Sequence, residues 1–207
     1  MKYGKKGFTV AELLIVVAIV GILVAISIPI LNVQLEKARE AHDIALMRTA
    51  AAAAMEYYYI GDYVKYSADL DNETDPEKKN IGLSVDRMST GPESWNAYGA
   101  YDPRTGKIYR TRDLLPPGKN GKRYVYGKGT KVDGGTRVPS GSESGEAYQS
   151  TEDYRNAVVM VSIYAKAATP HIDVYWKDNT KSTNSNYIGG KASNINGPKR
   201  CLRLYPN

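Results

Sequence analysis

The chain has very few of the residues that build small catalytic, metal-binding or disulfide-linked domains. Its 207 residues include one cysteine, Cys201, and two histidines, His42 and His171. A single cysteine excludes an intramolecular disulfide, and these three residues have neither the spacing of a metal site nor that of a nucleophile and its base. We therefore expect a fold held together by packing, with no catalytic residue, no metal site and no cofactor.

Phenylalanine is as scarce as cysteine. Phe8 is the only one in the chain, whereas there are 17 tyrosines. This imbalance indicates a requirement for phenylalanine that is specific to position 8.

The charge does not indicate a function by itself. The net charge is +6, and Lys2, Lys5 and Lys6 supply three of these charges, so +3 remains beyond residue 7. We read the remaining charges as dispersed, and no base-reading motif accompanies them. The sequence therefore predicts no sequence-specific nucleic-acid binding.

One long apolar run dominates the N-terminal region. From Leu13 to Leu31 there are 19 residues without a charge, about the length that crosses a bilayer as a helix. The three lysines precede the run and mixed charges follow it, which keeps the short N-terminus in the cytoplasm and the bulk of the chain outside. Glu12 lies at the edge of this apolar run, where a charged carboxylate is costly and is usually paired or functional.

Two interpretations of this region follow from the residues alone. One is a secretory signal peptide that is cut after Ser27, at the small residues Ala25-Ile26-Ser27. The other is an uncleaved transmembrane anchor, in which Glu12 is an interfacial acid. Neither explains the stretch Gly7-Phe8-Thr9 or the position of Glu12.

The stretch KKGFTVAELLIVVAIVGILVAISIP resembles the N-terminal signature of type IV prepilins and pseudopilins. In that family a basic leader ends in glycine, a prepilin peptidase cuts after it, and the new N-terminal phenylalanine is N-methylated. The matching residues here are Gly7 and Phe8. With Phe8 as the first mature residue, the family's fifth-position glutamate is Glu12 and its proline is Pro29. The resemblance covers about residues 5–35.

The resemblance implies a role for Glu12. In the filaments of this family, apolar helices dock side by side, and the glutamate pairs with the N-terminal amine of a neighbouring subunit. Here that pair is Glu12 with Phe8, and Gly21 and Pro29 lie within the same assembly helix. Val10, Ala11 and Ser27 depart from the residues common in the family, but they remove no charge and no cleavage determinant.

The helical pattern continues past the apolar run and ends at Gly61, a plausible C-terminal stop. Gly21 and Pro29 mark places where this helix could bend or unwind. In its second half one set of mostly small residues recurs at helical spacing: Ala38, Ala41, Ala45, Thr49, Ala52 and Met55. We expect this face to pack on a sheet, with Glu36, Lys37, Arg39, Glu40, Asp43 and Arg48 on other faces.

Beyond Gly61 the composition changes to glycine, proline, serine, asparagine and tyrosine with short β-rich runs. The expected strands are Lys107–Thr111, Arg123–Tyr126, Ala157–Ala165, Ile172–Trp176 and Cys201–Tyr205. The third is ambiguous, because Ser150 and Asp153 could instead form a helix capping box. β-Branched residues and Pro170 favour a strand and an antiparallel sheet.

The stretch DLDNETDPE places acids at alternate positions, Asp69, Asp71, Glu73 and Asp75. This is superficially similar to the start of a calcium loop, but it lacks the glycine and the final acid of such a loop. A solvated acidic loop or the start of a helix is the expected structure.

These observations predict an α+β fold with four parts: a leader (residues 1–7), a transmembrane and assembly helix (8–31), its amphipathic continuation (32–61) and an extracytoplasmic β-rich head (62–207). The expected function is that of a structural subunit of a type IV pilus-like filament. It would partner copies of itself, the prepilin peptidase and an assembly platform, in the cytoplasmic membrane before assembly and at the cell surface afterwards.

Two alternatives remain open. One is a pseudopilin of a type II secretion or DNA-uptake machine. The other is a monomeric, membrane-tethered binding module.

Overall fold

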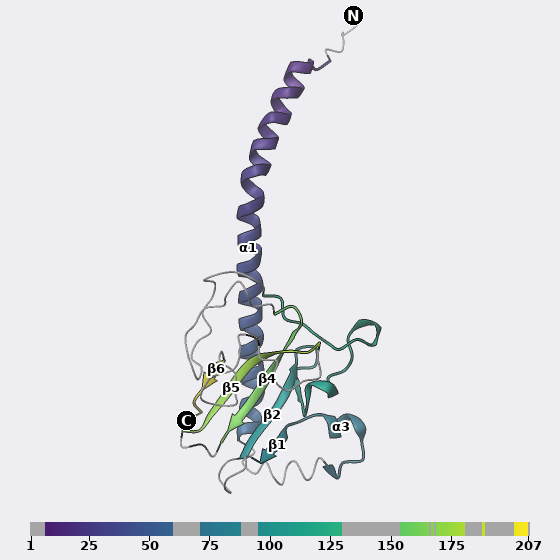
Figure 1. Cartoon of the computed structure of the whole chain (residues 1–207), viewed down its shortest axis with the longest axis vertical. Helices are drawn as coiled ribbons and strands as arrows, with labels where there is room; N and C mark the ends of the chain where they lie inside the picture. The colour runs from purple at the N-terminus through teal and green to yellow at the C-terminus, as the bar shows by residue number, and fades with distance from the viewer. Residues whose placement is uncertain are drawn as a thin grey trace, which may run out of the picture.

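The computed structural model describes residues 7–59, 71–87, 95–129, 154–165, 169–180 and 201–206, together with residues 167 and 188. It consists of one long helix and an antiparallel sheet that packs on the C-terminal half of that helix (Figure 1). This confirms the predicted α+β class.

The helix α1 runs without interruption from Val10 to Tyr58. It passes through both Gly21 and Pro29, and Figure 1 shows a gentle curve along its length. Its capping residue is Tyr59, so the predicted stop at Gly61 lies just outside the described residues. The other elements, in chain order, are α3 (Pro76–Asn80), β1 (Ser84–Arg87), β2 (Trp95–Asp102), β3 (Lys107–Tyr109), the 3-10 turns η1 (Arg112–Leu114) and η2 (Lys119–Gly121), β4 (Ala157–Tyr164), β5 (His171–Asp178) and β6 (Leu202–Leu204).

The strands form one antiparallel sheet in the order β1-β2-β4-β5-β6. Both β1 and β3 pair with β2. β1 pairs with the first part of β2, and β3 pairs with the last residues of β2. β4 and β5 pair along their full length, from Ala157 opposite Asp178 to Tyr164 opposite His171. These two strands are buried almost throughout, which fits the β-branched residues of β4 and the β-branched and aromatic residues of β5.

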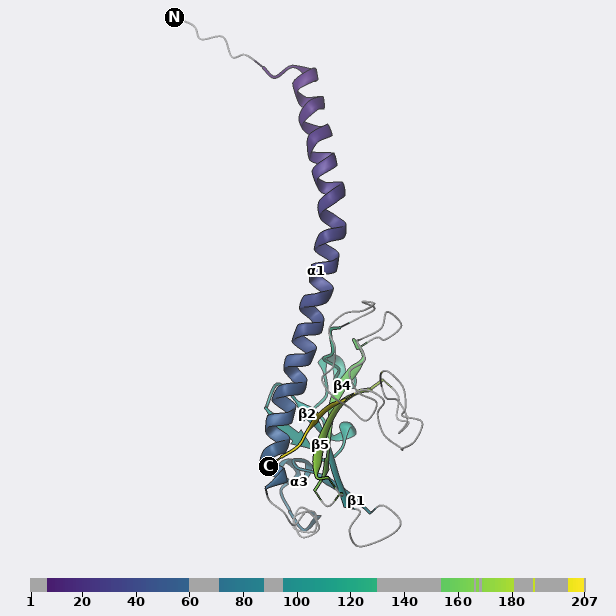
Figure 2. The same cartoon turned by 90° about the vertical axis from the view of Figure 1, so that its left-hand side faces the viewer.

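The main core lies between α1 and one face of the sheet (Figure 2). The helix contributes Ile44, Met47, Ala50, Ala51 and Ala54, and all five are at most 6% exposed. Opposite them lie side chains of the two central strands and their neighbours: Ala97, Val159, Val161, Ile163, Ile172, Val174, Trp176 and Leu202. The small alanines allow the helix backbone to approach the sheet closely.

The predicted packing face of α1 is wrong. Ala38, Ala41, Ala45, Thr49 and Ala52 are exposed, and Met55 is half-buried. The buried face lies on nearly the opposite side of the helix, a rotation of about 150° at 3.6 residues per turn. It also includes Glu40 and Asp43, which are 2% and 1% exposed and which the sequence analysis had assigned to other faces.

The opposite face of the sheet has a second, smaller apolar cluster. Val158, Met160 and Tyr175 of the sheet pack there with Leu115 and Cys201. The hydroxyl of Tyr126 donates to the carbonyl of Tyr101 at 2.6 Å and accepts from the backbone N–H of Val159 at 2.8 Å. The segment that follows β3 is therefore fastened to the sheet where β2 and β4 diverge.

Four of the five expected strands are confirmed with small changes at their ends, as β3, β4, β5 and β6. Arg123–Tyr126 is not a strand, and the sheet contains two strands that were not predicted, β1 and β2. Ser150 and Asp153 lie outside the described residues, and Ala157–Tyr164 is a strand.

Candidate assembly surface

The N-terminal turn of α1 is closed by two side chains. Thr9 is the N-cap residue, and its hydroxyl accepts from the backbone N–H of Glu12 at 3.3 Å. In return the Oε2 atom of Glu12 accepts from the backbone N–H and from the hydroxyl of Thr9, both at 2.8 Å. This is a capping box, which satisfies N–H groups that have no partner within the helix.

The capping box is a feature that the sequence analysis missed. Its signal is present in the sequence, since Thr9 and Glu12 have the Thr-x-x-Glu spacing directly before an apolar run. Glu12 therefore has a local role in its own helix. Both bonds from Thr9 go to Oε2, and no described residue donates to Oε1.

The residues at the expected cleavage position are open to solvent. The side chain of Phe8 is 91% exposed, and no atom lies within 4 Å of where a Cβ would project from Gly7. Residues 1–6 of the expected leader lie outside the described residues. The described part of this region would thus be accessible to an enzyme that acts between Gly7 and Phe8.

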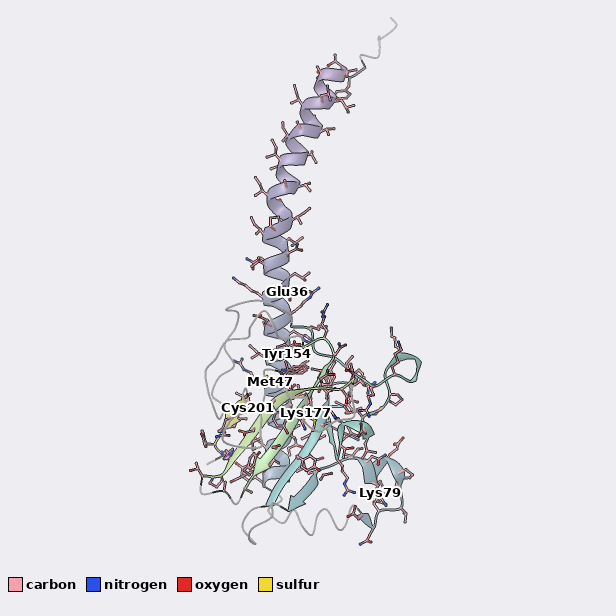
Figure 3. The ribbon with its side chains drawn as sticks, in the orientation of Figure 1. Glu36, Met47, Lys79, Tyr154, Lys177 and Cys201 are labelled. Atoms are coloured by element: carbon pink, nitrogen blue, oxygen red, sulfur yellow. The ribbon has the colours of Figure 1, made fainter. Side chains whose placement is uncertain are left out.

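The N-terminal half of α1 is apolar on every side and uncovered. Eighteen large apolar side chains between Phe8 and Leu35 are at least 47% exposed. Figure 3 shows the side chains of α1 above Glu36 projecting outward with no other element beside them. A patch of this size marks a surface that meets lipid or another protein, and α1 is the helix within the described residues that is long and apolar enough to cross a membrane.

The polar and helix-breaking residues of this half are accommodated within the helix. Ser27 donates its hydroxyl to the carbonyl of Leu23 at 2.6 Å, so this residue presents no unsatisfied donor to the apolar surroundings. Gly21 has open space where a side chain would project, which would allow another backbone to approach closely. Pro29 removes one N–H from the ladder without ending α1.

The lower half of α1 contains a second carboxylate that binds backbone. Asp43 accepts from the backbone N–H of Lys128, at 2.9 Å to each oxygen, and from that of Gly129. Burial raises the pKa of Asp43, and these bonds and the neighbouring His42 counteract that shift in part. A Cβ at Gly129 would lie 2.8 Å from Oδ2 of Asp43, so glycine is needed for this approach.

The remaining polar residues considered from the sequence do not form a reactive site. His42 lies beside Asp43, with Nδ1 3.4 Å from Oδ1, and His171 stacks on the ring of Tyr164 at the start of β5. Cys201 is buried. Among the described residues no three His, Cys, Asp or Glu side chains gather as metal ligands would.

The acidic stretch takes the structure of a helix start. Asp75 is the N-cap of α3 and accepts from the backbone N–H of Glu77 at 3.0 Å, with Pro76 at the first helical position. Asp71 pairs with Arg110 at 2.6 Å. Asp69 lies outside the described residues.

Comparison with known proteins agrees with this geometry. The model of the prokaryotic N-terminal methylation motif matches residues 2–28. The chain is 37% identical over 93 residues to a type IV major alpha-pilin of Moraxella bovis, a match that covers 44% of this chain and 54% of that relative. The chain thus aligns with about half the length of the relative, and no solved structure matches it. The chain thus carries the prokaryotic N-terminal methylation motif and is similar, over about half of that relative's length, to a type IV major alpha-pilin.

Proposed function

We propose that the chain is a structural subunit of a type IV pilus-like filament, cleaved after Gly7 and N-methylated at Phe8. The observation that supports this most is the uncovered apolar half of α1 with a carboxylate at its N-terminal end. In the cytoplasmic membrane, residues 8–31 would be covered by lipid. In the filament, at the cell surface, the same residues would be covered by the helices of neighbouring copies.

Glu12 can serve its own helix and a neighbour at the same time. Its Oε2 atom accepts both bonds from Thr9, and Oε1 points to no donor among the described residues. Cleavage after Gly7 would create a charged amine on Phe8, which a neighbouring subunit can bring to Oε1. A copy docked one turn out of register would leave both charges unpaired in apolar surroundings, so the pair favours one axial register.

Substitutions at two positions separate the capping role of Glu12 from its charge. Glu12→Gln keeps a carbonyl oxygen that can accept from Thr9 but removes the charge, whereas Thr9→Ala removes the hydroxyl and keeps the charge. Glu12→Ala removes both. We expect all three chains to reach the membrane, and we expect the two Glu12 variants to be lost from filaments sheared off the cell surface.

Thr9→Ala is the matched control, since it weakens the cap without removing the carboxylate. It should still appear in the sheared filaments. A yield like that of the unaltered chain from Glu12→Gln would contradict pairing to the Phe8 amine. Equal loss in Thr9→Ala and Glu12→Gln would mean that the cap, and not the charge, controls assembly.

The mass of the intact N-terminal peptide tests the processing and the kind of assembly together. A chain that begins at N-methylated Phe8 in sheared material supports a filament subunit made with a prepilin peptidase and an assembly platform. The same terminus found only in membranes would favour a pseudopilin of a secretion or DNA-uptake machine. A chain that still begins at Met1, or that is cut after Ser27, would overturn the proposal and favour a tethered binding module or a secreted protein.

A further inference from the structure

Positive charge is concentrated in one segment, residues 104–128, which we call the basic loop. It contains eight lysines and arginines and one acid, Asp113, which gives a net charge of +7. The whole chain has +6, of which residues 1–7 supply +3, so the rest of the chain sums to −4. The expectation of dispersed charge is therefore wrong.

The basic loop is folded back on itself, which brings Arg104 to residues 116, 117 and 124. Arg104 donates to the carbonyls of Pro116 and Pro117 and to the carboxylate of Asp102. Its guanidinium also lies 3.5 Å from the centre of the Tyr124 ring. The backbone N–H of Gly118 donates to the carbonyl of Lys122 at 2.9 Å, which closes the turn that contains Lys119.

Six cations of the basic loop are exposed: Arg104, Lys107, Lys119, Lys122, Arg123 and Lys128. Arg104 is paired with Asp102 and Arg123 with Asp113. The four lysines have no ion pair with any residue in the part of the chain that the structure describes. Their positive charge is therefore not neutralised by an ion pair with any described residue.

Two further cations lie beneath the exposed ones. Arg112 is 7% exposed and donates to the carbonyl of Asp178 at 2.6 Å. Lys177 is half-buried on β5, where Figure 3 labels it on the face of the sheet turned to the viewer. Burial and the guanidinium of Arg112 lower the pKa of Lys177 to about 8. An anion bound over this region would relieve the repulsion between these cations.

We propose that the basic loop binds the phosphate backbone of double-stranded DNA without reading its sequence. Duplex DNA carries about one charge per 1.7 Å of its axis, and neutralising its phosphates releases condensed counterions. Lysine suits this ligand, since it acts on phosphate as a mobile point charge. Binding would be confined to the basic loop, because the rest of the chain beyond residue 7 has the same sign of charge as DNA.

The aromatic residues of the basic loop disfavour recognition of single strands. Proteins that bind single-stranded nucleic acid stack bases on exposed aromatic rings. Arg104 covers a face of the Tyr124 ring, and the Tyr126 ring lies 5.3 Å from it. The ring is thus already packed, and the ligand is recognised by its charge.

The position of the basic loop disfavours anionic lipid as the ligand. Lys128 is fixed to Asp43, which lies 12 residues past Leu31, or about 18 Å along the helix. The layer of lipid head groups extends only about 5–8 Å past the hydrocarbon, and the Debye length is about 8 Å at physiological ionic strength. The basic loop therefore lies outside the field of a membrane spanned by residues up to Leu31.

The test measures binding of the full-length chain, in neutral-detergent micelles, to a fluorescent 24-base-pair duplex between about 50 and 300 mM NaCl. If the four unpaired lysines contact phosphates, the logarithm of the affinity should fall with the logarithm of the salt concentration with a slope of about −3.6. The variant Lys107→Gln/Lys119→Gln/Lys122→Gln should reduce that slope to about −1, in the same way for duplexes of different sequence. All proteins compared must have the same N-terminus, because Lys2, Lys5 and Lys6 would add equally to every slope and leave the expected difference of about 2.7 unchanged.

The matched control removes three exposed charges elsewhere, as Lys37→Gln/Arg48→Gln/Lys78→Gln, and should keep the original slope. Equal effects of the two triple variants would overturn the proposal, because net charge alone would then explain binding. It would also be overturned by a slope near zero, or by tighter binding to vesicles of anionic phospholipid or to polygalacturonate than to duplex at equal charge. Unfolding of each variant, followed by the fluorescence of the buried Trp176, excludes a loss of fold.

Discussion

The two halves of α1 belong to one continuous helix but obey opposite rules of burial. Between Val10 and Leu35 its large apolar side chains are exposed, whereas between Glu36 and Tyr58 two carboxylates are almost completely buried. One face of the lower half packs on the sheet and loops of its own chain. The upper half has no such surroundings in the described chain. An apolar side chain on this helix is therefore not necessarily buried within its own chain. In the upper half, the apolar side chains are suited to contact with lipid or with another protein.

The same contrast holds for Glu12 and Asp43, the two carboxylates of α1 that accept hydrogen bonds from backbone N–H groups. Glu12 accepts from Thr9, three residues away in its own helix, and remains exposed. Asp43 accepts from Lys128, 85 residues away, and is 1% exposed. One closes a helix end before any tertiary contact exists, and the other fastens a distant loop to the helix.

The largest expected effect is on the packed half. Met47→Ala removes a side chain that is 2% exposed, between α1 and the sheet, and should reduce the free energy of unfolding by about 2–5 kcal/mol. The matched change in the other half is Leu23→Ala, which should leave the unfolding of the head unaltered because Leu23 is 60% exposed. Urea titrations of the full chain in micelles measure both values. Similar losses from the two variants would mean that the halves unfold as one unit.

The next largest effect is expected at Asp43. Asp43→Ala leaves the N–H groups of Lys128 and Gly129 without their acceptor, which should cost about 2 kcal/mol. Hydrogen exchange should show faster exchange at these two amides, with little change in the amides of β4 and β5. Unchanged protection at Gly129 would show that the 127–129 segment is held by other contacts.

A smaller pair of substitutions distinguishes the predicted packing face from the observed one. Ala50 is fully buried and Ala52 is exposed, although only Ala52 belonged to the predicted face. Ala50→Leu should destabilise the head by about 1–3 kcal/mol because it forces the helix away from the sheet. Ala52→Leu should change stability by less than about 0.5 kcal/mol. The reverse order of effects would support the predicted face against the structure.

The sequence was sufficient for features whose cause is local. The apolar run to Leu31 predicted the uncovered helix, and the β-branched run of residues 157–164 predicted β4. The buried face of α1 could not be predicted from helical spacing, because the partners of Asp43 come from residues far along the chain. The strand β2, with the sequence WNAYGAYD, has little intrinsic preference for a strand and is defined by its three neighbours in the sheet.

The residues of the candidate assembly surface were predictable because they lie within one short segment. Gly7, Phe8 and Glu12 were identified because this segment resembles the prepilin signature, and their proposed roles need no distant residue of the same chain. The charges of the basic loop are also contiguous in sequence, and counting them over residues 104–128 would have found them. The turns that bring Arg104 to Tyr124 are tertiary contacts, and no sequence pattern indicated them.

The smallest expected effect concerns the pH dependence of Asp43. Burial raises its pKa in the folded chain above the ordinary value of 3.8, so the folded chain binds this proton more tightly than the unfolded chain does. The stability that this group contributes is therefore fully present below about pH 3.8 and is lost as the pH rises through the folded pKa. A neutral carboxyl still has oxygens that accept from Lys128 and Gly129, so protonation need not release the loop.

The comparison that isolates this group is with Asp43→Asn, which does not titrate. The free energy of unfolding of the unaltered chain, minus that of Asp43→Asn, should increase as the pH is lowered from 7 to 4. The charged and titratable groups nearest to Asp43 are His42, Glu40 and Lys128, and a parallel series with His42→Gln removes the ring that lies 3.4 Å away. A difference that decreases toward pH 4 would mean that the hydrogen bonds from the loop outweigh burial. Asp43 would then resemble Glu12, whose carboxylate is held by hydrogen bonds without being buried, and the contrast between the two halves of α1 would not extend to their carboxylates.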